Sequence, residues 1–255
     1  MTTKRPSLAV LSQSLLIALQ FLTRIPMPAM GRVDNALVGR SLLWYPLVGA
    51  LIGGLLWLLQ VFLQWLFPDL WSLQAALILS FWCLLTGGLH LDGLADSADA
   101  WAGGLGDRER TLGLMKDPTC GPAAVMIVIL LLLIKFSALA ALVARAPELL
   151  LLAPVVARGL LLLLFLSTDY VRSGGLGEAL VQHFPRTSAR YLLLILGLVL
   201  LIFGGSTGVA VLGCSLLLFV GLRQLMLRRI GGTTGDTAGA LVELSEAAVL
   251  LALLI

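Results

Sequence analysis

Long apolar runs alternate with short polar connections along the chain, in the pattern of a helical membrane protein. Runs such as Ala123–Ala144 and Leu149–Leu166 contain few charged residues and approach the length of about 20 residues that a helix needs to span a bilayer. We expect about seven spans, which are Leu42–Phe67, Leu70–Leu89, Pro122–Val143, Leu149–Ser167, Tyr191–Gly204, Val209–Met226 and Thr237–Ile255. The predicted fold is all-α, a polytopic bundle of membrane helices.

The first segment, Ser7–Arg24, has a different and amphipathic pattern. Its polar residues Gln13, Gln20 and Arg24 share one helical stripe, and its leucines share another. Such a helix is typical of one that lies in the membrane interface rather than across the membrane. A Pro-Met-Pro sequence at 26–28 follows it and is expected to end the helix.

Composition strengthens the membrane assignment and limits the domain organisation. Hydrophobic residues make up 59% of the chain, whereas soluble domains contain about 45–50% apolar residues. Because the apolar runs leave no room for a soluble domain of typical size, residues 1–255 are expected to form a single membrane-embedded domain. The three cysteines show neither metal-ligand spacing nor a disulfide framework.

Positively charged residues gather in alternate connections. They precede the first predicted span and lie between the second and third, the fourth and fifth, and the sixth and seventh spans. The other connections carry no lysine or arginine apart from Arg145. By the positive-inside rule, this pattern predicts a cytoplasmic N-terminus and an odd number of spans.

Three carboxylates stand directly after the second predicted span. Asp92, Asp96 and Asp99 have the spacing i, i+4 and i+7, which places them on one face of a helix. Carboxylate oxygens suit Mg²⁺, the usual companion of phosphate groups. We therefore expect metal-assisted phosphoryl transfer at the membrane surface, in preference to a solvated helix start. His90 is a candidate general base or partner of a metal ligand.

A second unusual segment opens the last predicted span. Gly231–Gly235 is a turn rich in glycine and threonine, which can bring backbone N–H groups and a helix N-terminus close to a phosphate. Asp236 and Glu243 follow on one helix face, and Glu243 and Glu246 enter the apolar run. Acids inside a membrane are costly, so they usually face a partner or a wet cavity and carry function.

Basic residues provide candidate partners for anions. Lys116, in the same connection as the three aspartates, could neutralise a phosphate, and Asp117 could extend a metal site, although a solvated loop explains both equally well. Arg158 and Lys135 lie inside predicted spans, where each should pair with an acid or bind an anion.

Four motifs occur in one order from near the start of the chain to near its end. They are Phe21-Leu-Thr-Arg24-Ile-Pro26, Gly87-Gly-Leu-His90-Leu-Asp92-Gly-Leu-Ala-Asp96, Met115-Lys116-Asp117, and Gly231-Gly-Thr-Thr-Gly-Asp236 with Glu243 and Glu246. Together they resemble those of the cobalamin synthases, also called adenosylcobinamide-GDP ribazoletransferases. The resemblance implies a Mg²⁺-dependent membrane enzyme of late cobalamin biosynthesis. In that reaction a hydroxyl of α-ribazole or its 5′-phosphate displaces GMP from adenosylcobinamide-GDP and forms adenosylcobalamin or its phosphate.

The resemblance also assigns roles to residues of this chain. The implied metal ligands are Asp92, Asp96 and Asp99, with Asp236 as a fourth. His90 would be the base, and Glu243 and Glu246 would hold a second metal or orient the nucleophile. Arg24 and the catalytic candidate Lys116 would neutralise phosphates, and Thr233, Thr234 and Gly235 would cradle one. Arg158, from its position inside a predicted span and not from the resemblance, is a further candidate for binding substrate.

Two other functions remain open at this point. One is an ion-coupled transporter with Glu243, Glu246 and Arg158 as its relay, although no internal repeat is visible. The other is a CDP-alcohol phosphotransferase, which would release CMP. For the ribazoletransferase we expect a bacterial inner-membrane location with the active site facing the cytoplasm. Its partners would be the two substrates and the lipid bilayer, with no nucleic acid, and a homo-oligomer is compatible with the sequence.

Overall fold

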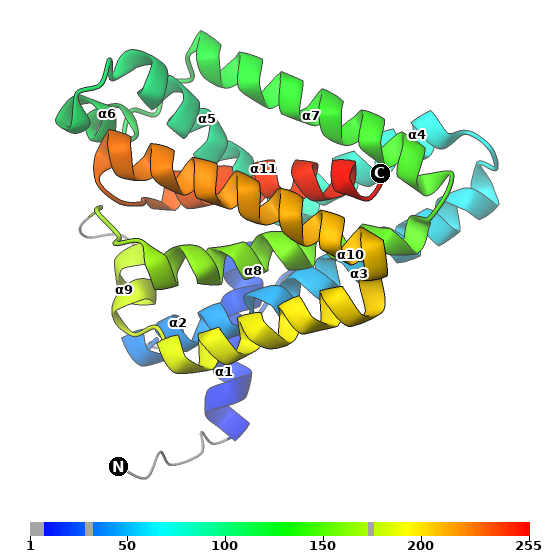
Figure 1. Cartoon of the computed structure of the whole chain (residues 1–255), viewed down its shortest axis with the longest axis horizontal. Helices are drawn as coiled ribbons and strands as arrows, with labels where there is room; N and C mark the ends of the chain where they lie inside the picture. The colour runs from blue at the N-terminus through cyan, green and yellow to red at the C-terminus, as the bar shows by residue number, and fades with distance from the viewer. Residues whose placement is uncertain (1–7, 29–32, 173–175) are drawn as a thin grey trace.

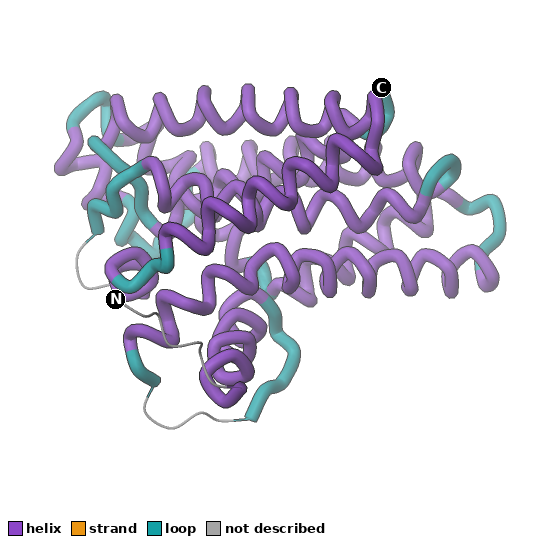
Figure 2. The backbone as a smooth tube through the Cα atoms, turned by 60° about the horizontal axis from the view of Figure 1, so that its bottom comes forward, coloured by secondary structure: helices purple, strands orange, loops and turns teal. Residues whose placement is uncertain are grey.

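The chain folds into helices that lie mainly along one direction (Figures 1 and 2). The computed structural model describes residues 8–28, 33–172 and 176–255. The α-helices in these ranges are α1 Leu8–Leu22, α2 Asn35–Ser41, α3 Tyr45–Leu66, α4 Trp71–Thr86, α5 Leu89–Gly103, α6 Arg108–Leu114, α7 Pro122–Val143, α8 Leu152–Ser167, α9 Leu176–Gln182, α10 Arg186–Ile230 and α11 Gly235–Ala252. Two 3₁₀ turns, Leu42–Trp44 and Pro147–Leu151, precede α3 and α8. The predicted all-α class is confirmed.

Within the described residues, four helical stretches are long and apolar enough to cross a membrane. They are Asn35–Leu66, Pro122–Val143, Pro147–Ser167 and Arg186–Ile230. A fifth is added if α4 and α5, which meet at an angle of 87°, are taken as one broken span or re-entrant loop. The outer faces of α3, α7 and α10 carry exposed apolar side chains such as Phe62, Ile129 and Phe203, as expected for surfaces that contact lipid. A polytopic helical membrane protein is therefore confirmed.

The difference from the seven expected spans arises at α10 and α11. Helix α10 contains one residue with non-helical backbone angles, Gly205 at φ 53° and ψ −131°. The chain turns back at this point (Figure 1), so the predicted spans Tyr191–Gly204 and Val209–Met226 correspond to the two halves of α10. Positive φ is unstrained only for glycine, which explains why the turn occurs at this residue.

Helix α11 lies in the interior of the bundle. It packs against α5, α7, α8 and α10, and most of its residues are buried. It corresponds to the predicted span Thr237–Ile255, but its three acids keep it out of the set of apolar candidates. Its neighbours therefore shield it from lipid, and their side chains must satisfy its charges.

Helix α1 runs across the long helices instead of alongside them (Figures 1 and 2). Its last turn is buried against the core, where Ala18 and Leu22 belong to the main apolar cluster. The predicted N-terminal helix is confirmed as a helix, and its position in the membrane interface stays a prediction.

Candidate active site

A sharp bend between α4 and α5 sets the direction of the helix that carries the aspartates. Gly87 and Gly88 have φ values of 66° and 68°, which only glycine adopts without strain. A Cβ atom at Gly87 would collide with the side chain of Arg24. The backbone N–H of Arg24 also donates to the Leu85 carbonyl at 2.7 Å. This hydrogen bond holds Arg24, two residues after α1, against the bend.

The first turns of α5 and α11 cross in direct backbone contact. A Cβ atom at Gly93 would lie 2.7 Å from the Asp236 carbonyl oxygen, and one at Gly239 would lie 3.2 Å from the His90 carbonyl oxygen. Only the absence of side chains at these two glycines permits the approach. The crossing therefore brings the aspartates of α5 beside Asp236, although the two motifs are far apart in the chain.

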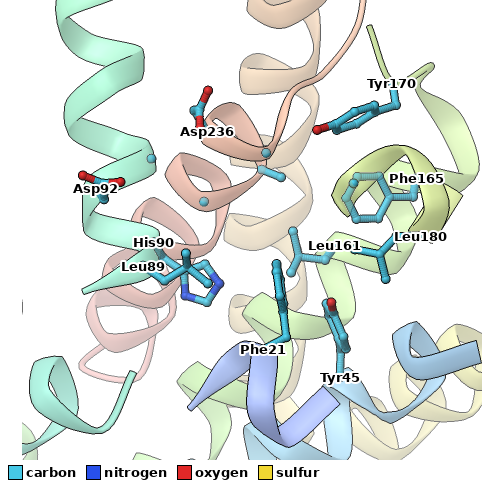
Figure 3. A pocket seen from close by; sticks show the side chains of 15 residues that line it. Phe21, Tyr45, Leu89, His90, Asp92, Leu161, Phe165, Tyr170, Leu180 and Asp236 are labelled. Carbon is cyan, nitrogen blue, oxygen red and sulfur yellow. The ribbon is translucent and has the colours of Figure 1, made fainter. Parts of the chain in front are cut away.

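His90, Asp92 and Asp236 line a cavity of about 150 Å³ beside this crossing. Figure 3 shows the two aspartates on neighbouring helices, with aromatic and aliphatic side chains from other helices around the remaining walls. The His90 side chain is only 5% exposed, and its Nδ1 atom has no hydrogen-bond partner in the described part of the chain. The Nδ1 atom is itself buried, so it is an unsatisfied polar atom of the interior and is not open to the cavity.

The aspartates around the crossing influence one another electrostatically. The negative charges of Asp92 and Asp236 act on Asp96, and Arg172 opposes them. Arg172 donates to Asp236 at 2.9 Å. Burial raises the pKa of Asp236, which lies at the start of α11 and outside the candidate spans, and the nearby Arg172 guanidinium counteracts this increase.

This arrangement fits a Mg²⁺ ion that is completed by substrate. Among the described residues, no three His, Cys, Asp or Glu side chains are grouped closely enough to hold a metal by themselves. Mg²⁺ often binds through one or two carboxylates and takes its remaining ligands from water and substrate phosphates. Repulsion among Asp92, Asp96 and Asp236 is the kind of charge that a divalent cation would relieve.

Asp99, which was predicted as a metal ligand, has backbone partners at the start of α7. Its Oδ2 accepts a hydrogen bond from the Gly121 N–H at 2.5 Å, and its Oδ1 accepts one from the Ala124 N–H at 2.9 Å. Both donors belong to the start of α7, where the backbone N–H groups have no partner within the helix. Asp99 therefore caps α7.

The threonines of the Gly231–Gly235 turn also have structural partners, contrary to their predicted role as a phosphate cradle. Thr233 and Thr234 are fully buried. Thr234 accepts from the Thr237 N–H at 3.2 Å, and Thr237 accepts in return from the Thr234 N–H at 2.9 Å, which forms a capping box. Gly235 alone of these three residues lines the cavity, so its backbone remains a candidate for contact with phosphate.

Glu243 and Glu246 lie deeper, in a network of four buried charges. Lys135 donates to Glu243 at 2.6 Å and to Glu246 at 2.5 Å, and Arg158 donates to Glu246. The Lys135 ammonium also lies 4.7 Å from the centre of the Trp82 ring. Both predicted basic residues thus pair with acids, which was one of their two expected roles.

None of these four residues lines the cavity. Glu243 and Glu246, predicted to hold a second metal or to orient the nucleophile, have Lys135 and Arg158 as partners in the structure. Arg158, a candidate for binding substrate, is fully buried against Glu246. The network joins α7, α8 and α11 in the interior and compensates the charge of two acids with that of two bases.

The two predicted phosphate partners lie at the surface. Arg24 is exposed and shares a surface groove with Asp92. Lys116 is exposed in the connection between α6 and α7, and the structure records no ion pair for it among the described residues. The neighbouring Asp117 accepts from the Thr119 N–H and hydroxyl, and these hydrogen bonds lower the pKa of its carboxyl.

Sequence reasoning missed Arg172, Tyr170 and the aromatic side chains of the cavity. Tyr170 and Arg172 follow α8 and reach the start of α11 through a parallel bridge between Tyr170 and Thr233. Burial raises the pKa of the Tyr170 hydroxyl. The only signal in the sequence was the position of Arg172 in a positively charged connection, which does not reveal its pairing with Asp236.

Comparison with known proteins identifies the family. The family model described as cobalamin-5-phosphate synthase matches residues 14–254. An adenosylcobinamide-GDP ribazoletransferase of Pseudomonas fluorescens strain Pf-5 is 57% identical over 238 residues, which cover 92% of this chain and 96% of the relative. Enzymes with the same name from Pseudomonas syringae pv. syringae and Pseudomonas entomophila are 56% and 57% identical over 93% of this chain and 97% and 96% of the relatives. No solved structure matches.

These matches cover nearly all of the chain, including every motif on which the resemblance was based. They favour a ribazoletransferase over the transporter and CDP-alcohol phosphotransferase alternatives, and they confirm the prediction of an enzyme of this kind. The chain therefore belongs to the cobalamin-5-phosphate synthase family, whose curated relatives are adenosylcobinamide-GDP ribazoletransferases.

Proposed function

We propose that this protein transfers adenosylcobinamide phosphate from adenosylcobinamide-GDP to α-ribazole or its 5′-phosphate and releases GMP. The names of the relatives support the substrates. The observation that carries the proposal for the site is the crossing of α5 and α11, which places Asp92 and Asp236 on one cavity with Asp96 nearby. Acids gathered beside a buried histidine suit chemistry on a diphosphate.

In the proposed reaction, an acceptor hydroxyl oxygen bonds to the phosphorus that carries the cobinamide group. The bond from this phosphorus to the bridging oxygen of the diphosphate breaks, and GMP leaves with that oxygen and the electron pair. His90, which lines the cavity, is the residue we propose to accept the hydroxyl proton.

Asp92, Asp96 and Asp236 are the residues we propose to hold Mg²⁺, and Asp99 is left out because it caps α7. Bound Mg²⁺ would offset the negative charge that develops on the diphosphate oxygens. Arg24 and Lys116 would bind the same phosphates from the surface side, and the Gly235 backbone would contact them at the start of α11. Arg172 orients Asp236 through its ion pair.

The proposed location is the bacterial inner membrane. The alternation of positively charged connections supports a cytoplasmic N-terminus and an active site open to the cytoplasm. A cytoplasmic opening would give a charged nucleotide substrate access without crossing the bilayer.

The direct test uses purified protein with adenosylcobinamide-GDP, α-ribazole and Mg²⁺, and follows GMP over time. We expect GMP release that stops with a chelator and returns with added Mg²⁺. Asp92→Asn and Asp96→Asn should each lower the rate by about a hundredfold or more, because each removes a charge that grips the cation. Absence of GMP with the wild-type protein would contradict the function, and wild-type rates in both variants would contradict the site.

A further inference from the structure

The cavity at the candidate active site has two chemically different ends. Asp92, Asp236 and His90 lie at one end, beside the crossing of α5 and α11. The other end is built from Phe21 of α1, Tyr45 of α3, Leu161 and Phe165 of α8, and Leu180 of α9 (Figure 3). Apart from the Tyr45 hydroxyl, the side chains at this second end are apolar, so it suits an apolar group better than a phosphate.

The apolar end has a flat wall. The rings of Phe21 and Tyr45 are stacked, with their centres 6.2 Å apart and an angle of 18° between their planes. Phe165 and Leu180 lie across the cavity from this pair (Figure 3). The cavity as a whole measures about 150 Å³, a volume that can hold one aromatic ring. Both the shape and the lining thus favour a planar aromatic group.

The acids at the other end indicate that the occupant also has a polar part. Asp92 and Asp236 line the cavity beside the crossing of α5 and α11, where their oxygens can accept hydrogen bonds. A ligand with an aromatic part in the apolar end and hydroxyl groups near these acids would use both ends. A nucleoside with an apolar base has this composition.

We propose that this cavity is the acceptor subsite, in which the benzimidazole base of α-ribazole lies against Phe21 and Tyr45 and its ribose points toward His90 and Asp92. The proposal rests on the ribazole transfer proposed above and assigns one substrate to one cavity. Guanine, the base of the leaving group, fits the apolar end poorly, since its polar edges would lose their hydrogen bonds there. The guanosine part would then bind on the surface side, near Arg24.

Substitution of a cavity wall tests the assignment. Leu180→Phe should fill part of the apolar end and raise the KM for α-ribazole by about tenfold or more, with the KM for adenosylcobinamide-GDP unchanged. Leu133→Phe is the matched control, because Leu133 is 55% exposed on the outer face of α7, and it should change neither KM. An increase in the KM for adenosylcobinamide-GDP instead, or no change in either KM, would overturn the proposal.

Two measurements on the wild-type protein avoid any folding problem in the variant. Free 5,6-dimethylbenzimidazole should inhibit competitively against α-ribazole and not against adenosylcobinamide-GDP. An α-riboside of adenine should be a poorer acceptor than α-ribazole by about tenfold or more, because its amino group would be buried without a partner. Competition against adenosylcobinamide-GDP, or equal use of both ribosides, would contradict the subsite.

Equilibrium binding separates this proposal from the proposed function. Dialysis of the purified wild-type protein against α-ribazole needs no turnover, and we expect binding that is at least about tenfold weaker in Leu180→Phe. Failure of the wild-type protein to bind α-ribazole would overturn the subsite. Binding that Leu180→Phe weakens, without GMP release, would support the subsite and overturn the proposed reaction.

Discussion

Asp92 and Asp99 stand on the same helix but have different neighbours. Asp92 lines the cavity, whereas both oxygens of Asp99 accept backbone N–H groups at the start of α7. The same residue type therefore has two positions in the structure, one at the candidate site and one at a helix terminus. The difference can be measured, because an amide can replace a capping carboxylate better than it can replace a metal ligand.

For Asp99→Asn we expect GMP release close to that of the wild type and a smaller loss of stability than for Asp99→Ala, because the asparagine oxygen can accept one of the two N–H groups whereas its NH₂ group cannot accept the other. Asp99→Ala should lower the free energy of unfolding by about 1–2 kcal/mol, since it leaves the two N–H groups of α7 without acceptors. Thermal unfolding in detergent and the GMP assay measure the two effects. Loss of Mg²⁺-dependent activity in a folded Asp99→Asn protein would indicate that Asp99 is a metal ligand and would contradict a purely capping role.

The residue types at the site were visible in the sequence, but their partners were not. The spacing of Asp92 and Asp96 correctly placed them on a helix, and the motif at Asp236 marked the second element of the site. Helical periodicity describes one element at a time, so it could not show that α7 would engage Asp99 or that Arg172 would reach Asp236. Those contacts depend on how distant segments pack.

At the scale of elements, the contact between α5 and α11 sets the geometry of the site. Gly93→Ala would put a methyl group 2.7 Å from the Asp236 carbonyl oxygen, and the helices must separate to accommodate it. We expect a loss of about 1–3 kcal/mol in stability and a fall in kcat of at least about tenfold, because the aspartates on the two helices move apart. Unfolding curves and GMP assays would measure both quantities.

Gly213→Ala is a suitable control for this change. Gly213 lies in α10, and a Cβ atom there has no heavy atom within 4 Å. The control should keep wild-type activity and should gain slightly in helix stability. Equal activity of Gly93→Ala and Gly213→Ala would show that close contact of α5 with α11 is not needed for the reaction.

The buried charges form a second connection between elements. Lys135→Met removes the ammonium group that both Glu243 and Glu246 contact, and it leaves an uncompensated acid in the interior. We expect a loss of about 3–5 kcal/mol in stability. In the double variant Lys135→Met with Glu243→Gln, the loss should be smaller, because one buried negative charge is removed with its partner. Additive losses in the unfolding midpoints would contradict this coupling.

The elements themselves were largely predictable, because the energetic cost of polar groups in lipid forces long apolar runs to form helices. Residues 122–143, for example, form α7 with the predicted bounds. The prediction was less complete for α11, which has the polar residues of an interior helix and the length of a span. A sequence pattern gives apolar length, whereas the packing of four neighbouring helices decides that α11 lies inside the bundle.

For the molecule as a whole, the candidate site lies where several connections between long helices meet. The start of α5, the start of α11 and the segment after α8 all contribute to it. Positively charged residues flank the same connections, so the positive-inside rule predicts that the site lies on the cytoplasmic side. The orientation of the chain in the membrane therefore determines the side from which substrates enter.

Labelling of the native Cys120 thiol can measure this orientation. It is exposed in the connection before α7, on the side of the candidate site, whereas Cys83 of α4 and Cys214 of α10 are only partly accessible within their helices. A membrane-impermeant maleimide should leave Cys120 unlabelled in intact bacterial cells and label it in inverted membrane vesicles, because a thiolate reacts only where reagent and water reach it. Cys120→Ser should remove the vesicle signal, which would show that the other cysteines do not contribute.

Labelling of Cys120 in intact cells would place the aspartates on the outer side of the membrane. A cytoplasmic nucleotide substrate could then not reach them, and the proposed orientation would be wrong even if purified protein released GMP.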